Sequence, residues 1–76
     1  MDSKLSAQWQ NLKQAWEAAR AAAEKGQREI DKMVDEYLAQ GGKLPSKEMR
    51  LHVEDLFYQE CEARGAMDQF IDEECG

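Results

Sequence analysis

The segment GGKLPS, residues 41–46, decides the fold, because it is the one place where the sequence interrupts an otherwise helical pattern. Its two glycines favour the left-handed geometry that ends a helix, and Pro45 cannot continue one. Ser46 is a preferred cap for a following helix, with Glu48 well placed in its first turn. The segment therefore predicts a tight reversal between two helices.

Before this segment, apolar residues recur at alternating steps of four and three, a 3.5-residue repeat. The repeat predicts one long amphipathic helix over about residues 3–40. Gly26 is its weak point, since glycine costs about 1 kcal/mol relative to alanine inside a helix, so a bend or a break there stays open. The repeat consists of Leu5, Trp9, Leu12, Trp16, Ala19, Ala23, Gly26, Ile30, Met33 and Tyr37.

After the turn, an apolar seam predicts a second helix over about residues 46–72. Gly65 could stop or bend it, and acidic residues at its end oppose the helix dipole, so residues 72–76 are expected to fray. The predicted fold is all-α, an antiparallel two-helix hairpin in which residues 1–76 form a single helical domain. The seam consists of Met49, Val53, Leu56, Ala63, Met67 and Phe70.

A tight reversal near residue 43 would pair residue i with about residue 87 − i. This register sets Phe70 against Trp16 and places the seam residue Glu60 opposite Gly26, where it must reach water or pair with Lys25 or Arg28. It also leaves an apolar stripe beyond the end of the second helix. We assign this stripe to a binding partner; it consists of Leu5, Trp9 and Leu12.

A two-helix hairpin has a thin core. A chain of 76 residues buries only about 60–65% of the surface that its unfolded form exposes. We therefore expect something else to cover the remaining apolar surface: a second copy, in a four-helix arrangement, or a different protein.

The last third of the chain is acidic. The net charge is −6, and residues 51–76 hold eight acids against the single base Arg64. Such a block attracts a basic surface and repels a nucleic-acid backbone, although a face that only maintains solubility has the same composition. The acids that we assign to partner binding are Glu54, Asp55, Glu62, Asp68 and Asp72.

The sequence lacks the motifs of the common catalytic and nucleotide-binding sites: GxGxxG, the P-loop, CxxC and HExxH are all absent. We expect no enzyme, no catalytic residue, no cofactor and no metal. A metal or redox site is a third hypothesis, since His52 lies near Glu48, Asp55 and Cys61 in the sequence, but we interpret His52 as a solvent-facing side chain. We expect the thiols of Cys61 and Cys75 to be reduced.

The sequence shows neither a secretory signal nor an apolar run long enough to cross a membrane, so we expect a cytoplasmic protein without membrane contact. The bases of the first predicted helix are interleaved with acids and form no basic stripe. We therefore expect no direct binding of nucleic acid.

These patterns favour a non-enzymatic protein-binding module, a small acidic inhibitor or modulator that docks on the basic, nucleic-acid-binding surface of a larger complex. Anti-CRISPR inhibitors and other nucleic-acid mimics of phages and mobile elements act in this way. The alternative is a structural or regulatory homodimer. An acidic hairpin that dimerises resembles the Rop family of plasmid RNA-pairing modulators in architecture, and the likeness carries over no residue roles.

Overall fold

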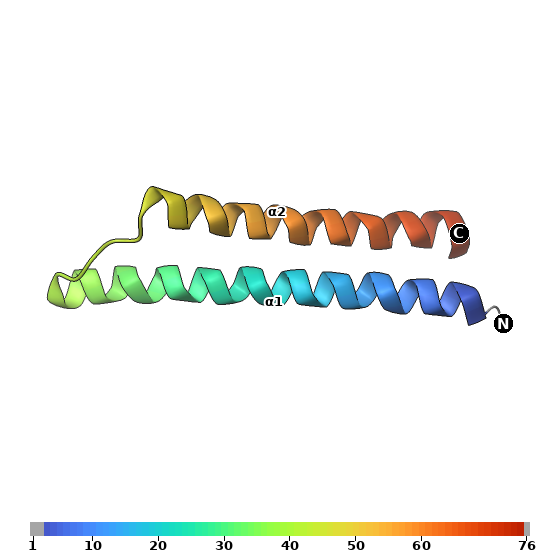
Figure 1. The fold of residues 1–76 in the computed structure, drawn as a ribbon, viewed down its shortest axis with the longest axis horizontal. Coiled ribbons are helices and arrows are strands. Elements are labelled where there is room, and N and C mark those ends of the chain that lie inside the picture. The colour runs from blue at the N-terminus through green and yellow to red at the C-terminus, as the bar shows by residue number, and fades with distance from the viewer. Residues whose placement is uncertain (1–2, 76) are drawn as a thin grey trace.

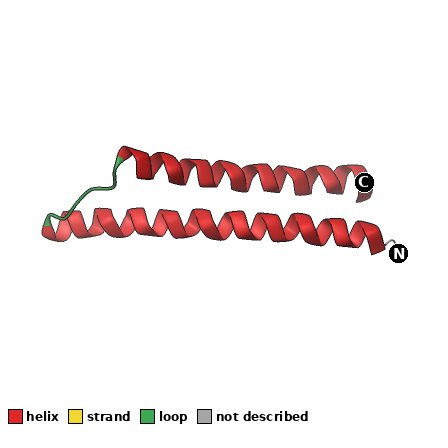
Figure 2. Cartoon of the chain, viewed as in Figure 1, coloured by secondary structure: helices red, strands yellow, loops and turns green. Residues whose placement is uncertain are grey.

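The computed structural model describes residues 3–75 and shows a helical hairpin (Figure 1). Helix α1 (Ser3–Gln40) is followed by helix α2 (Lys47–Phe70) and by one π-helical turn, η1 (Ile71–Cys75). The hairpin is a rod of 58 × 16 × 16 Å, with the N- and C-terminal ends side by side (Figure 1). Residues 3–75 contain no strand (Figure 2), so the predicted all-α hairpin is confirmed.

The turn uses the predicted residues. Gly41 ends α1 in the left-handed region at a φ of 74°, and its N–H donates to the carbonyl oxygen of Tyr37 at 2.8 Å. Ser46 caps α2, because its hydroxyl oxygen accepts a hydrogen bond from the N–H of Met49 at 3.1 Å. The linker between them is extended and runs back along α1 (Figure 1).

The extended linker corrects the predicted register. The numbers of the paired residues Trp9 and Phe70 add up to 79, as do those of Gly26 and Val53, instead of the expected 87. This difference of eight residues is roughly two helical turns. The prediction assumed that α2 begins beside the end of α1, whereas residues 41–46 carry the chain back along α1 before α2 starts.

The shifted register also corrects the predicted overhang. Leu5, Trp9 and Leu12 are half-buried, and the rings of Trp9 and Phe70 lie 5.8 Å apart at an angle of 32°. The uncovered stretch is at the opposite end, where α1 extends beyond the start of α2 (Figure 1). The exposed fractions there are 41% for Tyr37 and 76% for Leu38.

Gly26 neither bends nor breaks the first helix, since α1 is continuous across it. It is instead a point of close approach between the two helices. A Cβ atom added at Gly26 would lie 2.9 Å from Cγ2 of Val53 and 3.5 Å from Cδ1 of Leu56. Glycine is therefore required here by the neighbouring helix and not by the local backbone.

Gly65 does not interrupt α2, and a Cβ atom there would meet nothing within 4 Å. The expected fraying after residue 72 is also not seen over the described part. The chain continues as η1 to Cys75, and the side-chain amide of Gln69 donates to Glu73 at 3.0 Å. Gly76 lies outside the described residues.

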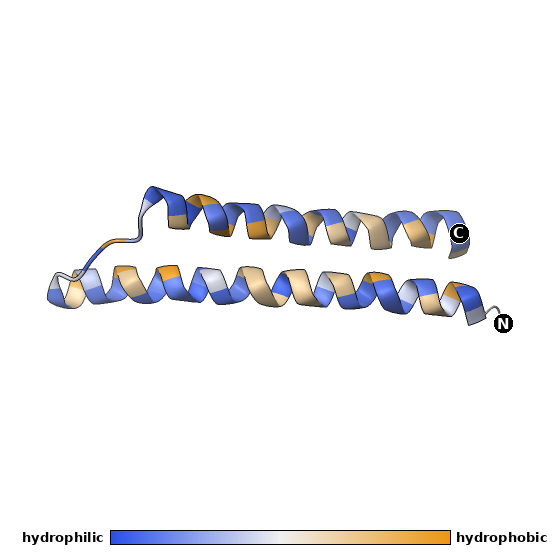
Figure 3. Ribbon diagram, in the orientation of Figure 1, coloured by the Kyte–Doolittle hydropathy of each residue, from blue (hydrophilic) through white to orange (hydrophobic). Residues whose placement is uncertain are grey.

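The core is as thin as expected. Among residues 3–75, the buried hydrophobic side chains are Ala23 and Val53, with exposed fractions of 0% and 4%. The remaining apolar residues recur along both helices (Figure 3) and are half-buried or exposed. Two packed helices thus bury only the side chains along the single line where they touch.

The two glycines give a matched test of the helix contact. Gly65→Ala should stabilise the protein by about 1 kcal/mol, because alanine is the better helix former and the site is open. Gly26→Ala should instead destabilise it by roughly 1 kcal/mol, since overpacking against Val53 outweighs the same gain. Urea unfolding at one fixed protein concentration measures both.

The Val53→Ala background is the control for the cause. Removing the valine methyl groups makes room for the added Cβ, so Gly26→Ala should become stabilising there. Equal stabilisation by Gly26→Ala and Gly65→Ala in the unmodified protein would contradict the close contact.

Candidate protein-binding surfaces

The five acids assigned to partner binding share the exposed half of the second helix. Glu54, Asp55 and Glu62 lie on α2, as does Asp68, and Asp72 lies in η1. All five are exposed, and helical periodicity places none of them on the seam that faces α1. From Glu54 to Asp72 the row is about 27 Å long at 1.5 Å per residue. We call this row the acidic face.

Neighbouring side chains one turn away contact two of these carboxylates, those of Asp55 and Glu62. The side-chain amide of Gln59 donates to Asp55 at 2.9 Å. A hydrogen bond to the Glu62 carboxylate, together with its negative charge, raises the pKa of Tyr58 above the ordinary value of 10.0. Such contacts orient the carboxylates along the helix without neutralising them.

The first helix adds no net positive charge, since residues 3–40 hold six acids and six bases. The ion pair that the structure records between described residues lies within α1, where Nε of Arg20 is 2.9 Å from Oε1 of Glu24. Within residues 51–75, Arg64 is the single base. The acidic face therefore keeps its negative potential in the folded hairpin.

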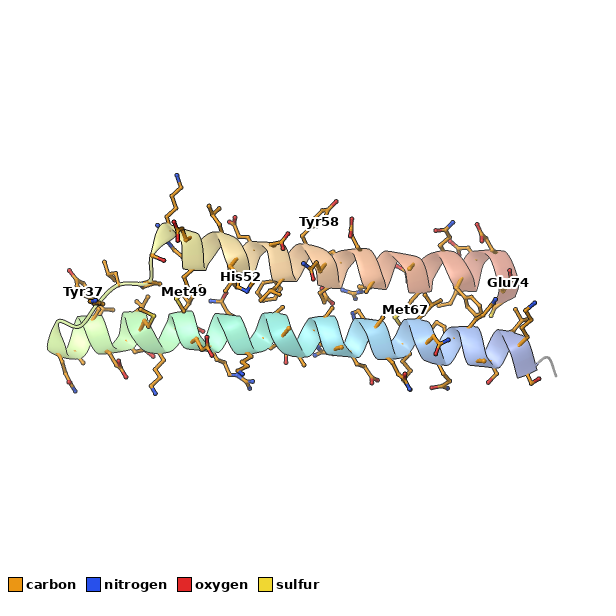
Figure 4. The ribbon with its side chains drawn as sticks, viewed as in Figure 1. Tyr37, Met49, His52, Tyr58, Met67 and Glu74 are labelled. Atoms are coloured by element: carbon orange, nitrogen blue, oxygen red, sulfur yellow. The ribbon has the colours of Figure 1, made fainter. Side chains whose placement is uncertain are left out.

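Two exposed apolar side chains lie on the same half of α2 as the acidic face, and neither belongs to the predicted site residues. Leu51 and Tyr58 are seven residues apart on α2 and are 51% and 62% exposed. Tyr58 points away from α1 (Figure 4). Their spacing was the available signal, because residues seven apart share one side of a helix and these two do not belong to the seam.

The predicted anchor residues Leu5, Trp9 and Leu12 are placed differently from the acids. They face α2 near its C-terminal end, where Leu12 and Phe70 line a shallow hollow together with Gln8 and Asn11. Their binding to a partner stays a prediction, but its original reason, an apolar stripe without cover, no longer holds.

A polar contact crosses the hairpin at Trp16. Its indole N–H donates to Oε1 of Glu60 at 2.7 Å, and the guanidinium of Arg20 lies 5.3 Å from the centre of its ring. Glu60 thus meets neither of the partners that the expected register offered. Since a half-buried indole N–H needs an acceptor, a tryptophan and a glutamate on facing seams were a detectable signal once the register was known.

A second hollow lies in the groove between the helices, beside the Gly26 contact. Met49 and His52 point from α2 toward α1 (Figure 4), and both line this hollow. Its other lining residues are Ala22, Lys25, Gly26, Glu29, Val53 and Leu56.

The described residues hold little else that suggests chemistry. No group of three or more His, Cys, Asp or Glu side chains within residues 3–75 could hold a metal ion. Cys61 and Cys75 are exposed free thiols. Over the same residues, neither helix has both the length and the apolar character needed to span a membrane.

Comparison with profiles of protein families, with curated proteins and with solved structures gives no significant match.

The Trp16–Glu60 contact can be tested by a double-mutant cycle. Trp16→Phe removes the donor and Glu60→Ala removes the acceptor, and urea unfolding gives the stability of each variant and of their combination. We expect a coupling energy of about 1–2 kcal/mol, the range for a hydrogen bond to a charged group. Replacing Glu60→Ala by Glu62→Ala, an exposed acid on the other side of α2, should give no coupling. Equal coupling in the two cycles would contradict the contact.

Proposed function

We infer that this protein is a non-enzymatic binding module that applies its acidic face to a basic surface of a larger complex, of the kind that binds nucleic acid. One observation carries the proposal. Five exposed carboxylates lie on one half of a helical segment, and the single base in residues 51–75 is Arg64.

The geometry supports competition with a nucleic acid. Five carboxylates over about 27 Å give one negative charge per 5–6 Å, compared with one phosphate per 3.4 Å along a single strand. The density is lower but of the same order. A basic groove that attracts phosphates would therefore also attract this face, and the helix holds its charges in place before binding.

Leu51 and Tyr58 supply an apolar contact on the same outward half of α2. Tyrosine is among the residue types that most often contribute large binding energies at interfaces. The proposal therefore uses these two residues as the anchor in place of Leu5, Trp9 and Leu12, which pack inside the hairpin.

Inhibition of a nucleic-acid-handling complex in the cytoplasm, as anti-CRISPR proteins perform it, is the activity that such docking would have. The alternative function, a structural or regulatory homodimer, is supported by the thin core of the hairpin. The two functions are compatible, because self-association through apolar side chains leaves the acidic face available.

Neutralising the acidic face tests the proposal. In the first variant, Glu54→Gln, Glu62→Gln and Asp72→Asn remove three charges from this face. In the matched control, Glu17→Gln, Asp35→Asn and Glu36→Gln remove three exposed charges from α1. Partners are captured from cell extract at about 0.1 M salt, where screening acts beyond ~10 Å, and are then purified for measurement of affinity.

The first variant should bind a captured partner on the order of tenfold more weakly, and the control should bind it normally. Because the contact is electrostatic, the partner should leave at about 1 M salt, and a duplex DNA oligonucleotide should displace the protein from it. A partner that binds both variants equally, or that duplex DNA does not displace, would rule out this function.

A further inference from the structure

The hairpin exposes more surface than a globular chain of its size. Its accessible surface is 6004 Å², whereas a folded monomer of 8.7 kDa exposes about 4,700 Å². The excess is about 1,300 Å². Two chains that each buried this area would share an interface of about 2,600 Å², which lies in the range of obligate homodimers.

One side of the hairpin offers an apolar surface for such an interface. The two hollows lie in the same groove between α1 and α2, because their lining residues belong to one stripe on each helix, with steps of three and four. On α1 this stripe consists of Gln8, Asn11, Ala15, Ala18, Ala22, Lys25 and Glu29. On α2 it consists of Met49, His52, Leu56, Gln59, Ala63, Ala66 and Phe70.

The middle of this groove is lined mainly by alanines, and its charged residues Lys25, Glu29 and His52 gather at one end. Small side chains let a neighbouring helix approach closely. The groove on the opposite side of the hairpin mixes charged and apolar side chains; helical periodicity places Lys13, Arg20 and Asp31 of α1 beside it, together with Phe57, Arg64 and Ile71, of which Phe57 and Ile71 are 38% and 43% exposed. The alanine-lined groove therefore differs by its uncharged middle, which the helices of a second copy can approach closely.

We propose that a second copy of this chain occupies the alanine-lined groove with its own groove, so that two hairpins form an antiparallel four-helix bundle. The occupant is a second copy because the excess area per chain matches what an obligate homodimer buries. An isologous contact also covers the same surface on both partners at once.

Charge sets the orientation. The end with both termini, residues 3–19 and 60–75, holds seven acids and three bases, whereas the turn end, residues 29–50, holds five acids and four bases. An antiparallel pair places the strongly acidic end of each copy near the almost neutral turn end of the other. A parallel pair would bring the two acidic ends together. This inference does not depend on the proposed function, since the acidic face stays exposed on both copies.

The first experiment measures association. Sedimentation equilibrium at micromolar concentration should give twice the chain mass of 8.7 kDa. Ala22→Glu puts a charge into the groove and should reduce association by a hundredfold or more, whereas Ala21→Glu, on the far side of α1, should leave it unchanged. A monomer in the unmodified protein, or equal effects of the two substitutions, would overturn the proposal.

The second experiment measures orientation and does not depend on the folding of a groove variant. In Cys61→Ser protein, a spin label on Cys75 marks the end with both termini, and both cysteines are exposed. Double electron–electron resonance should give a distance of about 40 Å between the two labels. The groove is centred near residue 18, Cys75 is level with about residue 4, and each helical residue adds 1.5 Å, so each label lies roughly 20 Å from the centre. A distance of about 10–20 Å, set by neighbouring helices in a parallel pair, would overturn the antiparallel arrangement.

Discussion

The close approach of Gly26 to Val53 is the contact on which the hairpin depends. The missing side chain at Gly26 lets a β-branched residue of α2 sit directly against the backbone of α1, and Val53 is one of the two buried hydrophobic residues in the described chain. This contact fits only one alignment of the two helices. If α1 shifted by one residue along α2, a Cβ atom of α1 would lie where the methyl group of Val53 now lies. The packing of Trp9 on Phe70 and the bond from Trp16 to Glu60 follow from the same register.

Local structure was readable from the sequence, and register was not. The 3.5-residue repeat, Gly41 and Ser46 predicted both helices and their caps, because these features depend on neighbours within a few residues. The register depends on how far residues 41–46 extend, and a tight reversal was assumed. Pro45 held a signal against this assumption, since a residue before proline favours an extended backbone. The error of about two turns moved the uncovered apolar end from Leu5 to Tyr37 and Leu38.

The hairpin separates its surfaces by chemistry. Small side chains line the middle of one groove, carboxylates and two exposed apolar residues occupy the outer half of α2, and mixed charges lie with Phe57 and Ile71 along the other groove. The acidic face was predictable because composition alone showed eight acids against one base in residues 51–76. The difference between the grooves was not, since it depends on which turns of the two helices are level. This separation allows one small chain to associate with itself and to present charge to another molecule.

The register is tested most directly by nuclear Overhauser contacts between side chains, recorded on a mixture of isotope-labelled and unlabelled chains so that contacts within a chain are distinguished. The account predicts intrachain contacts between the rings of Trp9 and Phe70, and between the indole N–H of Trp16 and the side chain of Glu60. Intrachain contacts between Trp16 and Phe70, as a tight reversal near residue 43 requires, would contradict it.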